Sequence, residues 1–501
     1  MAFVPLVFQP DLDCNWDVAP GALVDCRGVV PMRRGTYATW GCETPIATYT
    51  SGTEPVSAII TRKADGAARF FIGNKQSIYE YTSTTAATDR SSTTYSASTE
   101  TWTFAQFGDV TIATNLLNNV QSSSAGAFAD LAGTPPKAQL VAVNLGFVML
   151  ANYNDGTAYP DGWACSDIED PVDWTVTATN QADRGRLYDT PGPIRALVPW
   201  RDSFVAFKDD SMYIADYVGD PSSTIWSWRL ISDKVGCSAP HGVGVMNDQL
   251  YFLHRSGFYV FDGAQARRIG KECTNFLFET IAGASGGITF SKTQTTVDHK
   301  ESVVFFGLRS ASETKITSIF CYNTETGRWS YQSGQIFTNA SFASAYPTAV
   351  VRCTQSDMIA FDSGMSDDNP STAVMIGPDS TGKVAAQYPI YPSLGTTVPT
   401  VTLRSGSFGS ETRHTEVSGV KPRLYKYIAG TSPTLIVYGD KDESNAIAGA
   451  GSSTTGTWNS TELRWNVKRS DRYLSISMRF PCFAEIAGVF IDPAPTSRAS
   501  K

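Results

Sequence analysis

The residue types that most often perform acid–base or metal chemistry are few and widely spaced in this chain of 501 residues. Its four histidines, at positions 241, 254, 299 and 414, form neither a His-Glu-x-x-His pair nor a zinc-deaminase pattern with Pro-Cys-x-x-Cys. His254 lies in a strand-and-turn segment, where a satisfied or surface histidine is the better interpretation. The sequence therefore predicts no catalytic residue, no metal ligand and no cofactor, and we expect no enzyme activity.

Three acidic or aromatic stretches nevertheless allow a chemical interpretation. "DKDES" (440–444) spaces its acids like the start of a calcium loop, but Asn445 and Gly451 replace the Gly and Glu that an EF-hand needs at positions six and twelve. A solvated hairpin tip is the better prediction. "SDIEDPVDW" (166–174) and "YNTETGRW" (322–329) could be aromatic loops that hold a carbohydrate, yet packing of Trp174 and Trp329 against the core fits them better.

A repeated pair of strands is the element that positions these segments. "RDSFVAFKDDSMYIAD" (201–216) aligns without a gap on "NDQLYFLHRSGFYVFDG" (247–263), and looser copies bring the total to about seven starts between residues 69 and 364. Each copy has a strand, a polar turn and a second, alternating strand. In the second copy Ser256-Gly257 supplies the tight turn and Asp262-Gly263 supplies the next, where a positive φ suits glycine. Four-stranded units that recur every 40–50 residues are typical of β-propeller blades, which bury their faces against one another.

The charge distribution indicates two units. Residues 1–395 carry 27 Lys and Arg against 39 Asp and Glu, whereas residues 396–501 carry 13 against 9, so the acidic front is followed by a mildly basic tail. Nucleic-acid binding by the acidic part is disfavoured, because phosphate recognition requires clustered cations.

The nine cysteines contain no Cys-x-x-Cys pair, which argues against a zinc site or a disulfide framework and favours buried thiols. The start "MAFVPLVFQPDLD" lacks a basic region before its apolar residues, and the longest apolar run (138–151) is too short to span a bilayer. We therefore expect an intracellular product with no membrane span.

We predict an all-β fold: a β-propeller of about seven blades, with an extended N-terminal arm and a C-terminal β-sandwich or barrel domain. The expected boundaries are 1–45 for the arm, 46–390 for the propeller and 391–501 for the C-terminal domain. The Ser/Thr-rich stretch 81–102 is expected to be an exposed excursion, and 271–283 is the best candidate for a helix.

Four segments carry a resemblance to a known family: "LVDCRGVVPMRRGTY" (23–37), "WTFAQFGDVTIATN" (102–115), "CSDIEDPVDWT" (165–175) and "SGFYVFDGAQARRIG" (256–270). In this order they resemble the tail-nozzle, or packaged-DNA stabilisation, proteins of short-tailed bacteriophages. The resemblance implies a structural virion protein of the viral tail, made and assembled in host cytoplasm. It implies a homo-hexamer below the portal and its adaptor ring, which retains packaged DNA and serves as the channel for genome ejection.

The resemblance also implies the remaining partners. Tail fibres or spikes would attach to the outer surface. Double-stranded DNA would pass transiently without sequence-specific binding, because six copies with a summed charge of about −48 repel its phosphates. The basic tail suggests that Arg464, Lys468 and Arg469 contact the adaptor, so that reversing their charges should block attachment. The alternative is a receptor- or glycan-binding propeller of a tail fibre or lectin type, and a glycosidase with distant carboxylates is the third class.

Overall fold

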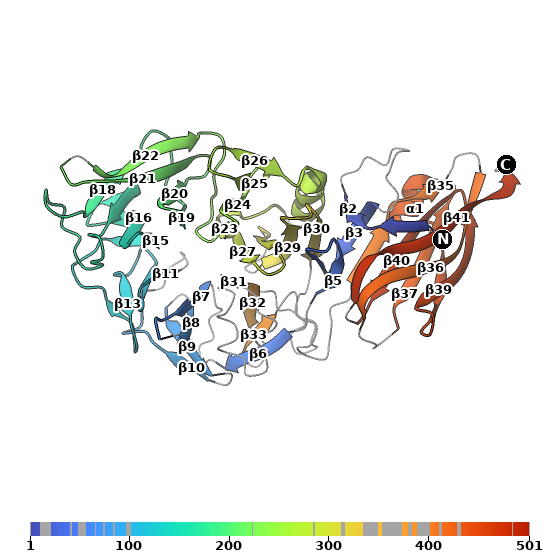
Figure 1. Cartoon of the computed structure of the whole chain (residues 1–501), viewed down its shortest axis with the longest axis horizontal. Coiled ribbons are helices and arrows are strands. Elements are labelled where there is room, and N and C mark those ends of the chain that lie inside the picture. Colours follow the sequence, from blue (N-terminus) through green and yellow to red (C-terminus); the bar gives the residue numbers. More distant parts are fainter. Residues whose placement is uncertain are drawn as a thin grey trace.

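The computed structural model describes residues 2–10, 22–40, 43–48, 57–65, 67–73, 76–83, 86–96, 102–222, 224–283, 286–311, 316–333, 349–352, 373–378, 383–387, 401–409, 413–427, 432–482 and 484–499. These residues are almost entirely strands and turns (Figure 1). The all-β prediction is confirmed.

Five antiparallel four-stranded sheets follow one another along the chain as the blades of a β-propeller (Figure 1). The first three are β11 (Thr103–Phe107), β12 (Val110–Thr114), β13 (Gln121–Ser123) and β14 (Ala129–Asp130); β15 (Lys137–Asn144), β16 (Phe147–Asn154), β17 (Ala158–Cys165) and β18 (Asp183–Arg186); and β19 (Ala196–Trp200), β20 (Ser203–Phe207), β21 (Met212–Asp220) and β22 (Thr224–Ser232). The next two are β23 (Val243–Met246), β24 (Gln249–His254), β25 (Gly257–Phe261) and β26 (Ala266–Ile269); and β27 (Gln294–Asp298), β28 (Val303–Arg309), β29 (Ile316–Asn323) and β30 (Trp329–Ser333).

The sequence repeat corresponds to equivalent hairpins of two successive blades. Segment 201–216 forms β20 and β21, and segment 247–263 forms β24 and β25. Gly257 and Gly263 have φ of 137° and 105° in the two turns that the sequence assigned to them, a backbone conformation that glycine tolerates. Trp329 packs on Phe258 of the preceding blade and on Phe306 of its own, with ring centroids 4.8 and 6.1 Å apart. Its predicted packing between blades is confirmed.

Eight further strands close the ring. They are β6 (Glu43–Thr48), β7 (Ser57–Arg62), β8 (Ala68–Gly73), β9 (Ile78–Ser83), β10 (Ala86–Asp89), β31 (Ala349–Arg352), β32 (Ala373–Pro378) and β33 (Lys383–Gln387). Single bridges between β7 and β31 and between β6 and β10 join them into one closed set, so the five separate blades differ from the predicted count of about seven. The early strand β6 pairs antiparallel with the late strand β33, and the first strands β7, β11, β15, β19, β23, β27 and β31 contact one another in a cycle.

A large, strongly curved sheet domain lies beside the ring (Figure 1). Its later strands are β34 (Val401–Ser405), β35 (Phe408–Gly409), β36 (Arg413–Tyr427), β37 (Thr434–Asp440), β38 (Ser452–Asn459), β39 (Arg464–Asp471), β40 (Tyr473–Phe480) and β41 (Ala484–Ala499). Strand β38 pairs with β37 on one part of its length and with β39 on the other, so the sheet folds round a buried core that includes Leu435, Trp465 and Ile486.

The N-terminal strands are built into this sheet domain. They are β1 (Ala2–Pro5), β2 (Val7–Phe8), β3 (Ala22–Arg27), β4 (Val29–Pro31) and β5 (Tyr37–Thr39). Strand β1 pairs with β41, β3 pairs with β34, and β5 pairs with β41 and β4. The expected arm thus supplies strands to the domain formed by the other end of the chain, and the sequence offered no pairing partner for it.

Two local expectations differ from the structure, and a third, the helix candidate, is confirmed. Residues 443–448 form the helix α1 (Glu443–Ala448), because Asp442 caps it by accepting a hydrogen bond from the Ser444 amide at 3.0 Å; "DKDES" is therefore not a simple hairpin tip. Within 81–102, Tyr95 and Trp102 are buried with centroids 5.0 Å apart, so part of this stretch belongs to a core. Segment 271–283 forms the short helices η1 (Lys271–Cys273) and η2 (Phe276–Ala282), and η3 (Phe290–Lys292) follows.

Within the described segments, no helix has both the length and the apolar character needed to cross a membrane. The last of the looser repeat copies, at 357–364, lies outside the described residues.

Candidate functional site

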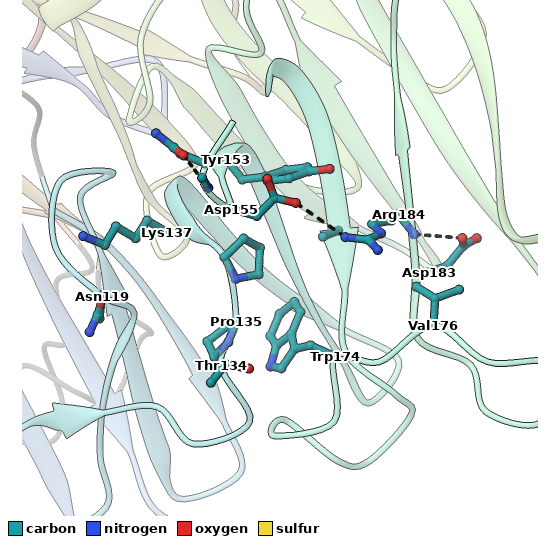
Figure 2. A pocket seen from close by; sticks show the side chains of 14 residues that line it. Asn119, Thr134, Pro135, Lys137, Tyr153, Asp155, Trp174, Val176, Asp183 and Arg184 are labelled. Carbon is teal, nitrogen blue, oxygen red and sulfur yellow. Dashed lines mark hydrogen bonds and ion pairs between the residues drawn. The ribbon is translucent and has the colours of Figure 1, made fainter. Parts of the chain in front are cut away.

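A groove between two blades of the propeller has a lining of polar, charged and aromatic side chains (Figure 2). Its volume is about 460 Å³, within the range of about 300–1,000 Å³ usual for small-ligand sites. It lies between the blade β11–β14 and the blade β15–β18. The lining includes Asn119, Pro135, Lys137, Tyr153, Asp155, Trp174, Asp183 and Arg184.

The loop between β17 and β18 supplies Trp174 and is held by its own acidic residues. Asp173 accepts hydrogen bonds from the Thr175 amide at 3.0 Å and from Asn180 Nδ2 at 3.1 Å, which lowers the pKa of its carboxyl. The Trp174 indole donates to the Pro171 carbonyl at 2.9 Å, and part of the ring packs on the buried cluster of the adjoining blades. The indole therefore lines the groove in a fixed orientation while it also packs on the core.

The charged groups of the groove are paired with one another or with backbone. Arg184 lies 3.5 Å from Asp155, and their side chains are 60% and 34% exposed. Asp183 accepts hydrogen bonds from the amides of Arg184 at 2.8 Å and Ile225 at 3.2 Å. With both carboxylates so engaged, the groove offers an aromatic face and hydrogen-bonding groups to a polar ligand.

Sequence reasoning singled out Trp174 but missed Tyr153, Asp155 and Arg184. Asp155 and Arg184 are separated by 29 positions and meet only because β16, β17 and β18 fold into one blade. No local pattern signals such a pair.

The centre of the propeller contains a smaller hollow, of about 230 Å³. The first strands of successive blades supply its lining, which includes Ile59, Ala105, Val141, Val198, His241 and Thr295. No side chain of Asp, Glu, Lys or Arg takes part in that lining among the residues that the structure describes.

The three predicted adaptor-contact residues lie on β39 but do not form one free basic cluster. Arg464 lies 2.5 Å from Glu462, and Lys468 lies 3.8 Å from Glu416. Arg469 lies 2.8 Å from Asp471 with only 19% of its side chain exposed, and it also donates to Ser452. Strand alternation places Arg464 and Lys468 on one face, and only Lys468, at 81%, is highly exposed.

His254 belongs to a buried polar contact between two blades. Its Nε2 lies 3.1 Å from Asp210 Oδ1, and its Nδ1 lies 2.7 Å from Ser256 Oγ. The Ser256 amide also approaches Nδ1 at 3.3 Å, so the serine is part of a local turn around the ring. The prediction of a satisfied histidine is confirmed, although its partner, Asp210, is 44 residues away.

The prediction of buried thiols is confirmed for the six cysteines that the structure describes. Cys26, Cys165, Cys237, Cys273, Cys321 and Cys482 are buried free thiols, and burial raises the pKa of Cys165, Cys321 and Cys482. No group of three or more His, Cys, Asp or Glu side chains positioned to hold a metal occurs within the described part of the chain.

Among known proteins, only solved structures show a likeness to this chain. No family model and no curated protein matches the chain. A catalytically inactive virginiamycin B lyase from Staphylococcus aureus with quinupristin is 12% identical with a TM-score of 0.42, over 69% of this chain and 98% of that one.

PorZ, a bacterial surface component of the type-IX secretion system of Porphyromonas gingivalis, is 11% identical with a TM-score of 0.38, over 72% of this chain and 43% of that one. An extracellular domain of a two-component system from B. thetaiotaomicron is 9% identical with a TM-score of 0.43, over 85% and 47% of the two chains. At these scores the likeness assigns neither ligand nor activity to this chain.

Proposed function

We propose that this chain is a structural subunit of a short-tailed phage particle, a tail nozzle that retains packaged DNA and conducts it at ejection. The observation that carries the proposal is the connection between the two parts of the molecule. Segment 23–37, which bears part of the family resemblance, forms β3–β5, and these strands pair with the sheet domain. They also hydrogen-bond to the blade β27–β30. Such a connection suits a subunit that transmits force between neighbouring rings of an assembly.

The joining contacts are numerous and buried. The Tyr37 hydroxyl donates to the Trp329 carbonyl at 2.9 Å, Ser330 Oγ donates to the Val29 carbonyl at 2.6 Å, and Asn323 Nδ2 donates to the Pro31 carbonyl at 3.1 Å. One hydrophobic core continues from the sheet domain into the propeller. These features support a rigid scaffold.

The proposal includes a propeller of seven blades. The series β7–β10 and the series β31–β33 with β6 are each antiparallel and four-stranded, and they support counting two further blades within the closed set. In this count β6 completes the last blade with a strand from the start of the chain, which resists opening of the ring.

The proposed DNA path does not follow the axis of the propeller. The central hollow has about 230 Å³, below the size of a usual small-ligand site. A DNA duplex is wider than its major groove, which is itself about 12 Å wide, so the duplex is too large for this hollow. The channel of the proposed nozzle is therefore the space enclosed by several copies, six in the proposed hexamer, whose net charge of −8 each repels phosphate and disfavours adhesion.

The remaining partners are part of the same proposal: a portal adaptor ring, tail fibres or spikes, assembly in host cytoplasm and a place in the virion tail. Of the three predicted adaptor contacts, Lys468 is the one whose charge is accessible. We expect Lys468→Glu to weaken attachment to the adaptor ring, and an unchanged yield of complete particles would argue against this contact.

Quantitative mass spectrometry of purified virions tests the function. We expect about half as many copies of this chain as of a twelve-subunit portal. Absence from the particle, or a few copies confined to fibres, would reject the nozzle.

The groove favours a second candidate function, a receptor- or glycan-binding propeller. Its fixed Trp174 face beside the Arg184–Asp155 pair is the arrangement that suits a sugar ring, which stacks on an aromatic face and hydrogen-bonds through its hydroxyls. A glycan array probed with the isolated chain and with Trp174→Ala tests this candidate. Binding that Trp174→Ala abolishes would support it, whereas the absence of any bound glycan would oppose it.

A further inference from the structure

Exposed apolar side chains are concentrated in two adjacent blades. Of the eleven large apolar side chains exposed in the described part of the chain, eight lie between Leu145 and Leu230. Leu145, Ile168 and Tyr217 line a shallow hollow of about 560 Å³ together with Asp202 and Asp216. Clustered apolar exposure of this kind marks an interaction surface.

The same region is strongly acidic. Residues 145–232 contain thirteen Asp or Glu against six Arg or Lys, a balance of −7 where the whole chain has −8. Glu169 and Asp202 are exposed, and neither forms an ion pair with another described residue. We call the surface formed by Leu145, Ile168, Glu169, Asp202 and Tyr217 the acidic apolar face.

The sheet domain presents a surface of the opposite character. Lys421, Arg423 and Tyr425 point outward from β36, and β41 separates this strand from Phe3 on β1. Arg423 stacks over the Phe3 ring at 5.2 Å, and Arg34 stacks over the Tyr425 ring at 4.4 Å. Within the described chain, Lys421 and Arg423 form no ion pair. We call Phe3, Arg34, Lys421, Arg423 and Tyr425 the basic aromatic face.

The two faces belong to opposite parts of the molecule. Blades β15–β18 and β19–β22 lie in the half of the propeller remote from the sheet domain (Figure 1). We infer that the acidic apolar face of one copy docks on the basic aromatic face of a second copy of this chain. Such a contact is heterologous, so repetition makes a ring when the rotation closes and a filament when it does not.

This inference rests on the proposed function only in expecting that the repeated contact closes as a ring. It specifies which surfaces join neighbouring subunits of that ring. Charge complementarity and exposed apolar area on both faces are what a second copy would bury. Nucleic acid fits the basic aromatic face less well. Its few cations fall short of the roughly 6–10 phosphate contacts of a DNA-binding protein.

Charge exchange between the faces tests the inference on the purified full chain. We would measure association by sedimentation velocity for the wild type, for Glu169→Lys with Asp202→Lys, for Lys421→Glu with Arg423→Glu, and for all four together. We expect each pair of reversals to weaken association about tenfold or more, because like charges then face each other, and the four together to restore it. Added salt should weaken wild-type association. Lys441→Glu, at an exposed position of the same domain, is the control and should leave association unchanged.

Circular dichroism of every variant verifies that the fold is retained. A wild-type chain that remains monomeric at all accessible concentrations would overturn the inference, as would pairs of reversals that leave association unchanged. Loss of duplex-DNA affinity in Lys421→Glu with Arg423→Glu, without a change in association, would instead assign the basic aromatic face to nucleic acid. Virion stoichiometry separates this result from the proposed function. If the chain is present at half the number of portal subunits but the charge reversals leave association unchanged, the nozzle proposal stands and only this interface is rejected.

Discussion

At the scale of single residues, the repeat places a buried base at the same point of two successive blades. Lys208 and His254 are equivalent in the alignment, and they are 0% and 5% exposed. The Lys208 ammonium donates to the carbonyls of Leu187 and Thr190, and burial lowers the pKa of Lys208. His254 contacts Asp210 and Ser256. Each base thus ties the turn of one blade to a neighbouring segment.

Protonation of His254 should make the free energy of unfolding depend on pH. Burial lowers its pKa below the usual value of about 6.5 even though Asp210 acts in the opposite direction. As the pH falls through about 6.5, the unfolded chain binds a proton at this site more readily than the folded chain does, so the free energy of unfolding decreases. The loss ends once the pH is below the folded-state pKa.

Replacing His254 with Gln should therefore flatten this part of the stability curve between pH 7 and 5. Chemical denaturation at a series of pH values measures the effect, and one unit of pKa difference corresponds to about 1.4 kcal/mol. His414→Gln, at a half-exposed position of β36, is the control. An equal pH dependence in wild type and His254→Gln would contradict the prediction.

Residue identity alone predicted those features that depend on a residue and its immediate neighbours. The turn glycines Gly257 and Gly263 and the buried free thiols are of this kind. The partner of His254 and the Asp155–Arg184 pair are not, since each joins segments that approach only in the folded blade.

At the scale of elements, apolar runs separated by polar turns located the hairpins, although blade strands such as β16 and β24 bury the side chains of both faces rather than one alternating set. Helix α1 was missed, since its six residues lack helical periodicity and its signal is a single cap at Asp442. The β17–β18 loop was recognised as a turn, but its packing against the preceding blade was not.

Gly133 controls that packing. It has φ of +79°, and a Cβ at this position would come within 1.5 Å of the Val172 carbonyl oxygen. Gly133→Ala should displace the loop that carries Trp174 and lower the free energy of unfolding by about 1–3 kcal/mol. Gly126→Ala is the matched control, because nothing lies within 4 Å of its added Cβ. Urea denaturation compares the two, and a Gly133→Ala loss no larger than that of Gly126→Ala would show that the loop adapts.

At the scale of the whole molecule, the sequence predicted a propeller and a second β domain, but the place of the N-terminus could not be predicted. Ala2 pairs with Ile491, so the two ends of the chain meet in one sheet. No local pattern specifies a partner at that distance. The closing pair β6–β33 is beyond local prediction for the same reason.

The shared core predicts how the molecule unfolds. Phe8 on β2 is 1% exposed and lies between the two parts, with its ring 5.7 Å from Phe276 and 5.6 Å from Tyr331. Because the core continues from the sheet domain through these rings into the propeller, we expect one calorimetric transition for the wild-type chain. Phe8→Ala removes a buried ring from the junction, which should cost about 3–5 kcal/mol and separate the unfolding of the sheet domain from that of the propeller.

Differential scanning calorimetry of the full chain tests this, with Leu117→Ala, 47% exposed on the propeller, as the control that should leave the profile unchanged. Two transitions in the wild type would show that the parts unfold independently. A single transition of undiminished temperature in Phe8→Ala would show that the hydrogen bonds from Tyr37, Ser330 and Asn323 couple the parts without this ring. A transition that splits in two in Phe8→Ala would instead show that the apolar junction joins the two parts into one mechanical body. The proposed force-transmitting subunit requires such a junction.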